Sequence, residues 1–281
     1  MFSTSKKSPT VFVGTYTESE GSTSEGMYVY RMDPASGTLT FERVVKGVVN
    51  PSFLEIPPQQ GFIYAVNEVG NFARQPWGSV SAFSINSSVE LNVLNAQPSH
   101  GADPCYISIE HTGRFALVAN YSSGSVAMLP IRTDGQLGPA TDMIQHSGSS
   151  SHPEQQTGPH AHCILPDPTN RYAVAADLGA DKLLIYQMDL ENGKLYKHAE
   201  VQVQPGAGPR HLTFHPNGRY AYLINELNST LNAYRYDSNN GTFEALQTVC
   251  TLPSDFKSEN LCADVTTQGK GVTKSGKKGA S

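Results

Sequence analysis

Short apolar runs recur along the whole chain and are separated by clusters of Pro, Gly, Asn and Asp. The first three runs are residues 11–17, 26–32 and 37–45, and they are rich in Val, Tyr and Thr. Runs of this length and composition, bounded by turn residues, predict β-strands. No stretch has a long helical period of apolar positions, so we expect an all-β protein.

One pattern occurs twice between Gly158 and Glu226, first as GPHAHCILPDPTNRYAVAADLG and then as GPRHLTFHPNGRYAYLINEL. In each copy a run opened by Pro leads through a turn, PDPTN or PNG, into an apolar run that ends in polar residues. This order predicts an antiparallel hairpin. Because paired strands run in opposite directions, the start of the first and the end of the second share one edge of the sheet. That edge would carry His160, His162, Asp177, Arg210 and Glu226.

The unit repeats along the chain, and its opening prolines lie 53, 55 and 50 residues apart, at Pro51, Pro104, Pro159 and Pro209. Four strand-like runs fill each unit, at residues 50–99, 103–148, 159–206 and 209–253, after three strands at the start of the chain. Four-stranded units with a period of roughly 50 residues are typical of β-propeller blades. A β-sandwich does not repeat one cassette at a fixed period. We therefore expect a β-propeller of about five blades, open or incomplete.

One propeller domain over residues 11–265 accounts for the apolar runs, and we expect residues 1–10 and the Gly/Lys/Ser tail 266–281 to be disordered. Three strands at the start and the opening of a sixth unit would leave an open arc. Its bare strand edges and blade faces would make the product prone to aggregation or dependent on a partner, and weak or inactive as an enzyme. A compact monomer that binds no hydrophobic dye would contradict this expectation.

Charge and cysteine usage favour a small-molecule ligand. The formal net charge is −5, whereas binding to nucleic acid would demand a basic face. No run resembles a signal peptide or a membrane span, so we expect a cytoplasmic protein without a membrane partner. The four cysteines have no metal-type spacing and are expected to be buried thiols: Cys105, Cys163, Cys250 and Cys262.

Several motifs in matching order resemble the seven-bladed lactonase family: FVGTYT, NPSFL, YAVNE, VANY, GPHAH, DLG, GPRH and ENLCADV. The resemblance extends from about residue 11 to residue 265 and is to propeller-type bacterial 6-phosphogluconolactonase and fungal carboxy-muconate cyclase. It implies hydrolysis or formation of a lactone ring. It places the active groups on His162, Arg210 and Glu226, with His160 and His211 beside them.

The same residues suit lactone hydrolysis on chemical grounds. The reaction needs a base for water, a cation or donor for the developing oxyanion and, for a phosphorylated sugar, a guanidinium for the phosphate. Glu226 and His162 could share the first task, and Arg210 could serve either of the others. We align His160 with Ser52, Cys105 and Arg210. Substrate binding is assigned to six side chains, which are His160, His211, Asn225, Glu68, Asn120 and Asp177.

We therefore expect hydrolysis of a sugar lactone by direct attack of water, without cofactor or metal. The expected reaction is 6-phosphogluconolactone to 6-phosphogluconate in the pentose phosphate pathway. The alternatives are a carboxy-muconate cyclase, a non-enzymatic propeller that serves as a binding platform, and an inactive truncated product.

Structural interpretations of the same residues also stay open. Arg210 and Glu226 could form an ion pair between blades, and Glu68 could be a repeated structural Glu in the column of Glu226. A metal site would have to use histidines without a carboxylate at ligand spacing: His146, His152, His160 and His162. A serine nucleophile is not expected, because the sequence contains no G-x-S-x-G motif.

Overall fold

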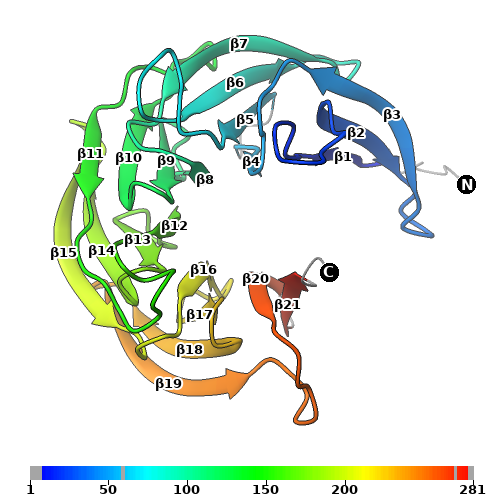
Figure 1. Cartoon of the computed structure of the whole chain (residues 1–281). Helices are drawn as coiled ribbons and strands as arrows, with labels where there is room; N and C mark the ends of the chain where they lie inside the picture. Colours follow the sequence, from blue (N-terminus) through cyan, green and yellow to red (C-terminus); the bar gives the residue numbers. More distant parts are fainter. Residues whose placement is uncertain (1–7, 58–60, 269–270, 278–281) are drawn as a thin grey trace, which may run out of the picture.

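The computed structural model describes residues 8–57, 61–268 and 271–277. Throughout these residues the regular structure is β-strand, arranged as sheets that stand side by side around a common centre (Figure 1). This part of the chain contains no helix of the length and apolarity that crossing a membrane requires. The predicted all-β, propeller-type architecture is confirmed.

The strands of each sheet are antiparallel and follow one another in chain order from the centre outward (Figure 1). The first sheet holds β1 (Thr10–Val13), β2 (Gly26–Met32) and β3 (Leu39–Lys46). The second holds β4 (Leu54–Glu55), β5 (Phe62–Asn67), β6 (Ser79–Ile85) and β7 (Leu91–Pro98), and the third β8 (Pro104–Ile109), β9 (Phe115–Asn120), β10 (Ser125–Pro130) and β11 (Asp142–Gln145). The fourth holds β12 (Ala161–Pro166), β13 (Tyr172–Asp177), β14 (Lys182–Asp189) and β15 (Lys194–Gln202). The fifth holds β16 (Pro209–Phe214), β17 (Tyr220–Asn225), β18 (Thr230–Asp237) and β19 (Thr242–Cys250), and a last hairpin holds β20 (Leu261–Gln268) and β21 (Gly271–Lys277).

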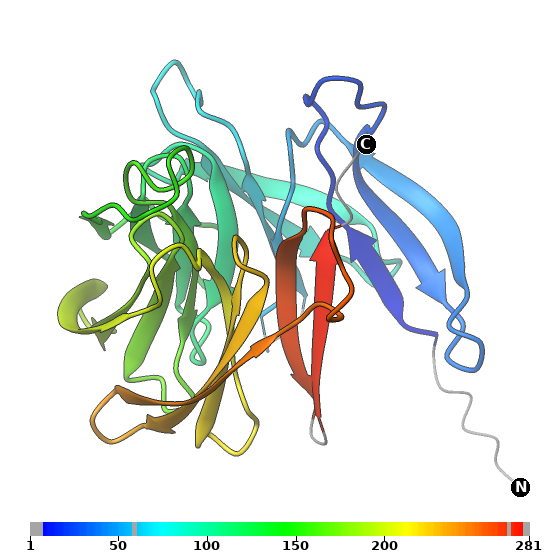
Figure 2. The ribbon, with the colours of Figure 1, turned by 60° about the horizontal axis from the view of Figure 1, so that its bottom comes forward.

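The predicted strand plan agrees with these sheets, with three strands at the start followed by four complete four-stranded units. In the described residues the sheets form an open arc rather than a closed ring. The gap of the arc lies between the first sheet and the hairpin of β20 and β21 (Figure 1). Figure 2 shows this hairpin standing beside the fifth sheet, and its Cys262 and Val265 pack with Ile224 of β17.

Each of the four four-stranded sheets buries both of its faces against neighbouring sheets, which explains the continuous apolar runs in the sequence. In β9, Leu117 and Ala119 pack toward the fourth sheet, whereas Ala116 and Val118 pack toward the second. The alternation follows from the two-residue period of a strand. Since both faces are filled, adjacent sheets are held at a fixed angle and their inner strands converge on one centre.

Turns at the far end of the hairpins are fixed by carboxylates. Glu110 accepts backbone hydrogen bonds from Thr112 at 2.8 Å and Arg114 at 2.7 Å. Asp167 accepts them from Arg171 and Tyr172, both at 2.9 Å. Such side-chain acceptors stabilise tight turns because they satisfy N–H groups that the ladder leaves unpaired. Each turn sets the register of its hairpin, and the register decides which residues reach the centre.

The expectation of disordered ends is wrong in part. Thr10 begins β1, and the backbone of Gly271–Lys277 pairs with β20 in an antiparallel register that runs from Gln268↔Gly271 to Leu261↔Lys277. Backbone pairing needs free N–H and C=O groups at a strand edge, which β20 offers, and it does not need apolar side chains. Residues 1–7, 269–270 and 278–281, to which the same expectation applied, lie outside the described residues.

Candidate active site

A cavity of about 300 Å³ lies at the centre of the arc, at the start of the inner strands. Its lining comes from the loop after β1 and from four successive sheets. The residues that line it are Tyr16, Ser52, Phe53, Glu68, Cys105, Tyr121, His162, Arg210, His211 and Glu226. Concave sites lined by a few convergent polar groups are the usual place for small-molecule chemistry.

A β-bulge at the start of the inner strand directs one side chain of each of the third, fourth and fifth sheets into this cavity. The register skips Cys105 between Pro104 and Tyr106, and it skips His162 and Arg210 at the same place in the fourth and fifth sheets. Ser52 occupies this place in the second sheet, next to Phe53, whose carbonyl accepts from Val66 at 3.1 Å. A bulge leaves one residue outside the ladder and re-aims its side chain, a common device beside active sites.

A second set of lining residues follows the second strand of the sheets by one position. Glu68, Tyr121 and Glu226 come directly after β5, β9 and β17. Their backbone N–H groups donate to carbonyls that precede the inner strands, at Asn50 (3.0 Å), Asp103 (2.9 Å) and Gly208 (2.7 Å). The fourth sheet carries the apolar Leu178 at this place, and its N–H donates to the carbonyl of His160 at 2.8 Å. The repeated backbone thus supplies two fixed side-chain positions per sheet.

His162, Arg210 and Glu226 lie together on one wall of the cavity. The Arg210 Nε donates to Glu226 Oε2 at 2.6 Å, and His162 Nε2 lies 3.9 Å from the same oxygen. Arg210 Nη1 also donates to the carbonyl of Ala263. The three side chains are between 10% and 15% exposed, so their charges interact with little screening by water. An imidazole, a guanidinium and a carboxylate therefore meet in one small volume.

His211 joins this wall to β20. Its Nδ1 lies 2.8 Å from Asp264 Oδ1, and its Nε2 lies 3.4 Å from Arg210 Nη1. Burial by itself raises the pKa of Asp264, but the hydrogen bond and charge of His211 outweigh it and lower the pKa overall. The ring of His211 meets the edge of His162 at 5.2 Å between centroids. His211 therefore contacts both Arg210 and His162 from the side of β20.

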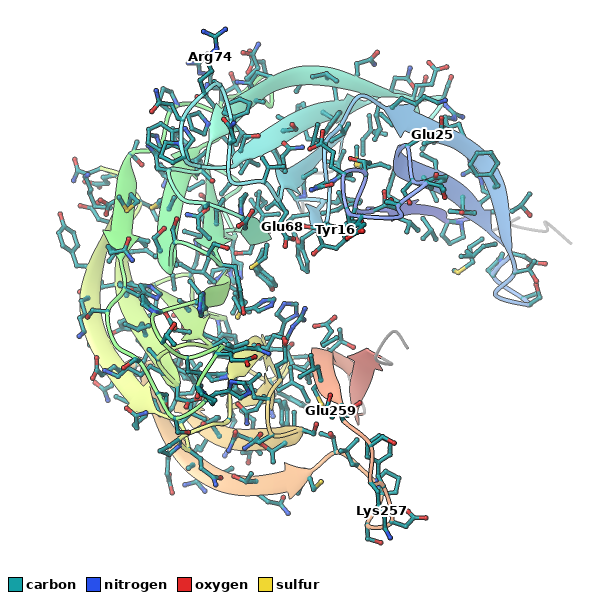
Figure 3. All side chains as sticks on the ribbon, in the orientation of Figure 1. Tyr16, Glu25, Glu68, Arg74, Lys257 and Glu259 are labelled. Carbon is teal, nitrogen blue, oxygen red and sulfur yellow. The ribbon has the colours of Figure 1, made fainter. Side chains whose placement is uncertain are left out.

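Tyr16, Ser52 and Glu68 form the opposite wall. Glu68 Oε2 accepts a hydrogen bond from the Tyr16 hydroxyl at 2.8 Å and another from Ser52 Oγ at 2.5 Å. In Figure 3, Tyr16 and Glu68 lie next to each other at the inner end of their sheets. Glu68 was expected to bind substrate, and the structure brings it to the cavity.

Cys105 lies between the two walls with its Sγ 3.7 Å from His162 Nδ1. Burial, and then the charge of Glu68, raise the pKa of this thiol well above its ordinary value. A thiol that stays protonated is a poor nucleophile. The expectation of buried thiols is confirmed for Cys105, Cys163 and Cys262 but is wrong for Cys250, which is exposed.

Three of the expected substrate-binding residues do not line the cavity: Asn120, Asp177 and Asn225. They are the last residues of their strands and are fully or almost fully buried, and their side chains bond within the protein. Asn120 Nδ2 donates to the carbonyl of Ser99 at 3.1 Å, and Asp177 Oδ1 accepts from the amide of His160 at 2.9 Å. Glu68 and Glu226, which do line the cavity, come one position after the end of their strands.

His160 also departs from its expected place. The bulge position equivalent to Cys105 and Arg210 is occupied by His162, and the carbonyl of His160 takes the role of those of Asp103 and Gly208. The imidazole of His160 stacks on Tyr121 at 4.6 Å between centroids, and its Nδ1 lies 3.0 Å from the Tyr121 carbonyl. His160 therefore supports the cavity wall and is not one of the residues that line it.

Within the described residues, the histidines considered for a metal site do not belong to a group of three or more metal-binding side chains. His146 is buried between Asp177 Oδ2, 2.7 Å from its Nδ1, and the Tyr186 hydroxyl, 2.9 Å from its Nε2. Both ring nitrogens are thus used inside the protein. His152 accepts backbone hydrogen bonds from Glu154 and Gln155 within its own loop.

Sequence reasoning missed Tyr16, Ser52, Phe53, Cys105 and Tyr121 as lining residues. Tyr16 and Ser52 lie inside the FVGTYT and NPSFL motifs, and Tyr121 ends VANY, so the motifs themselves were the available signal. The repeat alone does not mark these positions, because different residue types occupy one place in successive sheets.

Comparisons with known proteins agree with this architecture. The family description "Lactonase, 7-bladed beta-propeller" matches residues 10–278. The chain is 34% identical to 6-phosphogluconolactonase of Bacillus subtilis, over 93% of this chain and 72% of that protein. The periplasmic gluconolactonase of Pseudomonas aeruginosa superposes with a TM-score of 0.86 at 35% identity, over 94% of this chain and 75% of that one.

A crystal structure of a protein from Lactobacillus plantarum is similar as well, with a TM-score of 0.85, 30% identity and coverage of 96% of this chain and 76% of that chain. The matches cover almost all of the described strands. Together with the arc of four-stranded sheets and the polar central cavity, they show that the chain belongs to the seven-bladed β-propeller lactonase family.

Proposed function

We propose that the protein hydrolyses a sugar lactone by direct attack of water, at the wall formed by His162, Arg210 and Glu226. The observation that carries the proposal is the meeting of these three groups in a cavity of suitable size. Lactone hydrolysis needs a proton acceptor and a stabiliser for the oxyanion, and these are the groups present.

His162 is the proposed base. Imidazole is the side chain whose unperturbed pKa lies nearest to neutral pH, which suits proton transfer in both directions. The 3.9 Å between His162 Nε2 and Glu226 Oε2 is too long for a hydrogen bond, and a water molecule could contact both atoms. In this scheme Glu226 orients the water while His162 takes its proton.

The reaction then proceeds through a tetrahedral intermediate. The water oxygen bonds to the carbonyl carbon, and the positive charge of Arg210 stabilises the resulting oxyanion. The bond between the carbonyl carbon and the ring oxygen breaks, and the imidazolium of His162 returns its proton to the leaving alkoxide. The product is the open-chain hydroxy acid, and no redox step or cofactor enters the balance.

The proposed substrate is 6-phosphogluconolactone, which gives 6-phosphogluconate, a reaction of the pentose phosphate pathway in the cytoplasm. The support is the name of the Bacillus subtilis relative. The Pseudomonas aeruginosa relative is named for the unphosphorylated lactone, so both substrates belong in the test.

The direct test mixes the protein with freshly prepared 6-phosphogluconolactone or gluconolactone and follows acid release against the spontaneous rate. We expect faster release that survives excess EDTA, and loss of the enhancement in His162→Asn. His111→Asn is the matched control, since His111 is an exposed turn residue. Release at the spontaneous rate with both lactones would reject the proposal, and restoration by a divalent ion after EDTA would reject the metal-free mechanism.

A further inference from the structure

The Tyr16–Ser52–Glu68 wall has a chemistry opposite to that of the wall that carries Arg210. Both hydroxyl groups direct their protons to a single oxygen, Glu68 Oε2, at 2.8 Å from Tyr16 and 2.5 Å from Ser52. Tyr16 is 43% exposed, so part of its ring and hydroxyl remains accessible beside the cavity. Figure 3 places Tyr16 with Glu68 near the centre, whereas Arg74 of the same region points outward.

This wall is held from behind by Asn50. The Asn50 Oδ1 accepts from the backbone N–H of Thr17 at 2.8 Å and of Glu18 at 2.9 Å, directly after Tyr16. Its Nδ2 donates to the carbonyl of Glu68 at 3.0 Å. One amide side chain therefore ties the loop of the first sheet to the strand end of the second.

The same loop is also fixed on its other side. Gly14 passes so close to Pro51 that an added Cβ would lie 1.9 Å from the Pro51 carbonyl oxygen, and only glycine fits there. The Tyr16 carbonyl accepts from Ser22 Oγ at 2.5 Å within the loop. Contacts on both sides of Tyr16 favour a preformed position for its phenol rather than one that arises on binding.

The direction of the hydrogen bonds decides what this wall can recognise. Burial, and then the neighbouring Glu68 carboxylate, raise the pKa of the Tyr16 phenol, so the hydroxyl stays protonated and donates to Glu68. Since the single protons of Tyr16 and Ser52 are committed to Glu68, their oxygens can offer only lone pairs to a ligand. A carboxylate and two such oxygens accept hydrogen bonds and repel anions.

Hydroxyl groups of a ligand are the complementary donors. A ligand hydroxyl would donate to Tyr16 or Ser52, which in turn donate to Glu68. Each hydrogen bond in this series is strengthened because successive hydrogen bonds polarise one another. A ligand carboxylate held against this wall offers only acceptors and negative charge at neutral pH, and the wall disfavours it. The opposite wall, with Arg210, suits the carbonyl and its developing negative charge.

We propose that Tyr16, Ser52 and Glu68 are the specificity-determining residues that select a polyhydroxylated lactone and turn its hydroxyl-bearing edge away from Arg210. This inference rests on the proposed hydrolysis of a sugar lactone, and it adds the residues that select the hydroxyl groups and the orientation of the bound ring. The wall distinguishes a sugar lactone from a muconolactone, because the carboxylate of a muconolactone bound in the same orientation would face Glu68.

The test compares glucono-δ-lactone with δ-valerolactone, which has the same six-membered ring and no hydroxyl groups. We expect Tyr16→Phe, Ser52→Ala and Glu68→Gln to lower kcat/KM for gluconolactone, by about tenfold for Tyr16→Phe and more for Glu68→Gln, because each removes a hydrogen bond in a charged network. The kcat/KM for valerolactone should stay within about twofold of the parent value. Matched controls are Tyr196→Phe and Glu154→Gln, whose side chains are exposed.

A fall in the ratio of the two kcat/KM values in the site variants, but not in the controls, supports the proposal. A parallel fall with both lactones would show a merely structural role and overturn it, as would an unchanged ratio. Ser52→Ala guards against a loop disturbance caused by Tyr16→Phe.

A binding measurement separates this inference from the hydrolysis itself. Calorimetric titration with the anhydrohexitol that keeps the ring and hydroxyl groups of glucose but lacks a carbonyl requires no turnover. Binding to the parent that weakens about tenfold in Tyr16→Phe and Glu68→Gln would support the wall even if no lactone is hydrolysed. Absence of binding to the parent, or equal binding to all variants, would overturn it.

Discussion

The same position at the start of the inner strand carries Ser52 and Cys105 in the second and third sheets but His162 and Arg210 in the fourth and fifth. The backbone geometry is repeated, and the chemistry is not. The first pair holds a hydroxyl and a protonated thiol beside Glu68, and the second pair holds an imidazole and a guanidinium beside Glu226. The repeat therefore fixes where side chains point, while their identity divides one cavity into the proposed binding wall of Tyr16, Ser52 and Glu68 and the proposed reacting wall of His162, Arg210 and Glu226.

The largest effect is expected at the reacting wall. His162→Asn and Glu226→Gln should each lower kcat by about 10²-fold or more, because they remove the proposed base and the group that orients the water. Steady-state kinetics with the phosphorylated lactone, and with His111→Asn as the control, measure this. Parent kinetics in both variants would place the chemistry elsewhere and leave the ion pair as a structural clamp.

A smaller effect is expected at Arg210, whose Nε contact with Glu226 is 2.6 Å. Arg210→Ala should lower kcat by about tenfold, because the charge that stabilises the oxyanion is lost, and it should also lower the melting temperature since Glu226 stays buried without its partner. Arg210→Lys keeps a charge but not the fork geometry and should fall in between. Arg74→Ala, at an exposed position, serves as the control. An unchanged kcat would contradict a role of Arg210 in stabilising the oxyanion.

The pH dependence of stability tests the burial of a carboxyl group in the second sheet. Burial raises the pKa of Glu55 in β4 to about 7 from its ordinary 4.5. A carboxyl whose pKa is raised by folding stabilises the protein in its protonated form below pH 4.5, and this contribution is lost as the pH rises through 7. Glu55→Gln should therefore raise the melting temperature at pH 8 by about 3 °C and leave it unchanged near pH 4. Equal shifts at both pH values would contradict a buried titrating carboxyl.

The smallest effect is expected at Cys105. Because its thiol stays protonated, Cys105→Ser should change kcat/KM by less than about threefold, and iodoacetamide at neutral pH should label the exposed Cys250 first. Mass spectrometry of the labelled peptides gives the order of reaction. Rapid labelling of Cys105 with loss of activity would assign it to the reacting wall.

Much of the fold could be predicted from the sequence because the signals are local and repeated. The period of about 50 residues, the turn residues and the apolar runs locate all four complete sheets, and strand pairing follows from hairpin turns. His162, Arg210 and Glu226 could be named because they stand at strand starts and ends within a recognisable motif. The pairing of Gly271–Lys277 could not, since backbone pairing at a free edge leaves no apolar pattern to detect.

The sequence by itself determined the repeat, the strand order and the edge of the sheets at which chemistry-bearing residues gather. Only the tertiary structure decided which of those residues share the cavity. The bulge brings His162, and not His160, to the cavity. Glu226 lines the cavity, whereas Asn225, one position earlier at the strand end, does not. Because neighbouring residues of a strand point to opposite sides, a shift by one position exchanges a cavity residue for a buried one. Which side chains then share the cavity depends on the packing of sheets that are far apart in the chain.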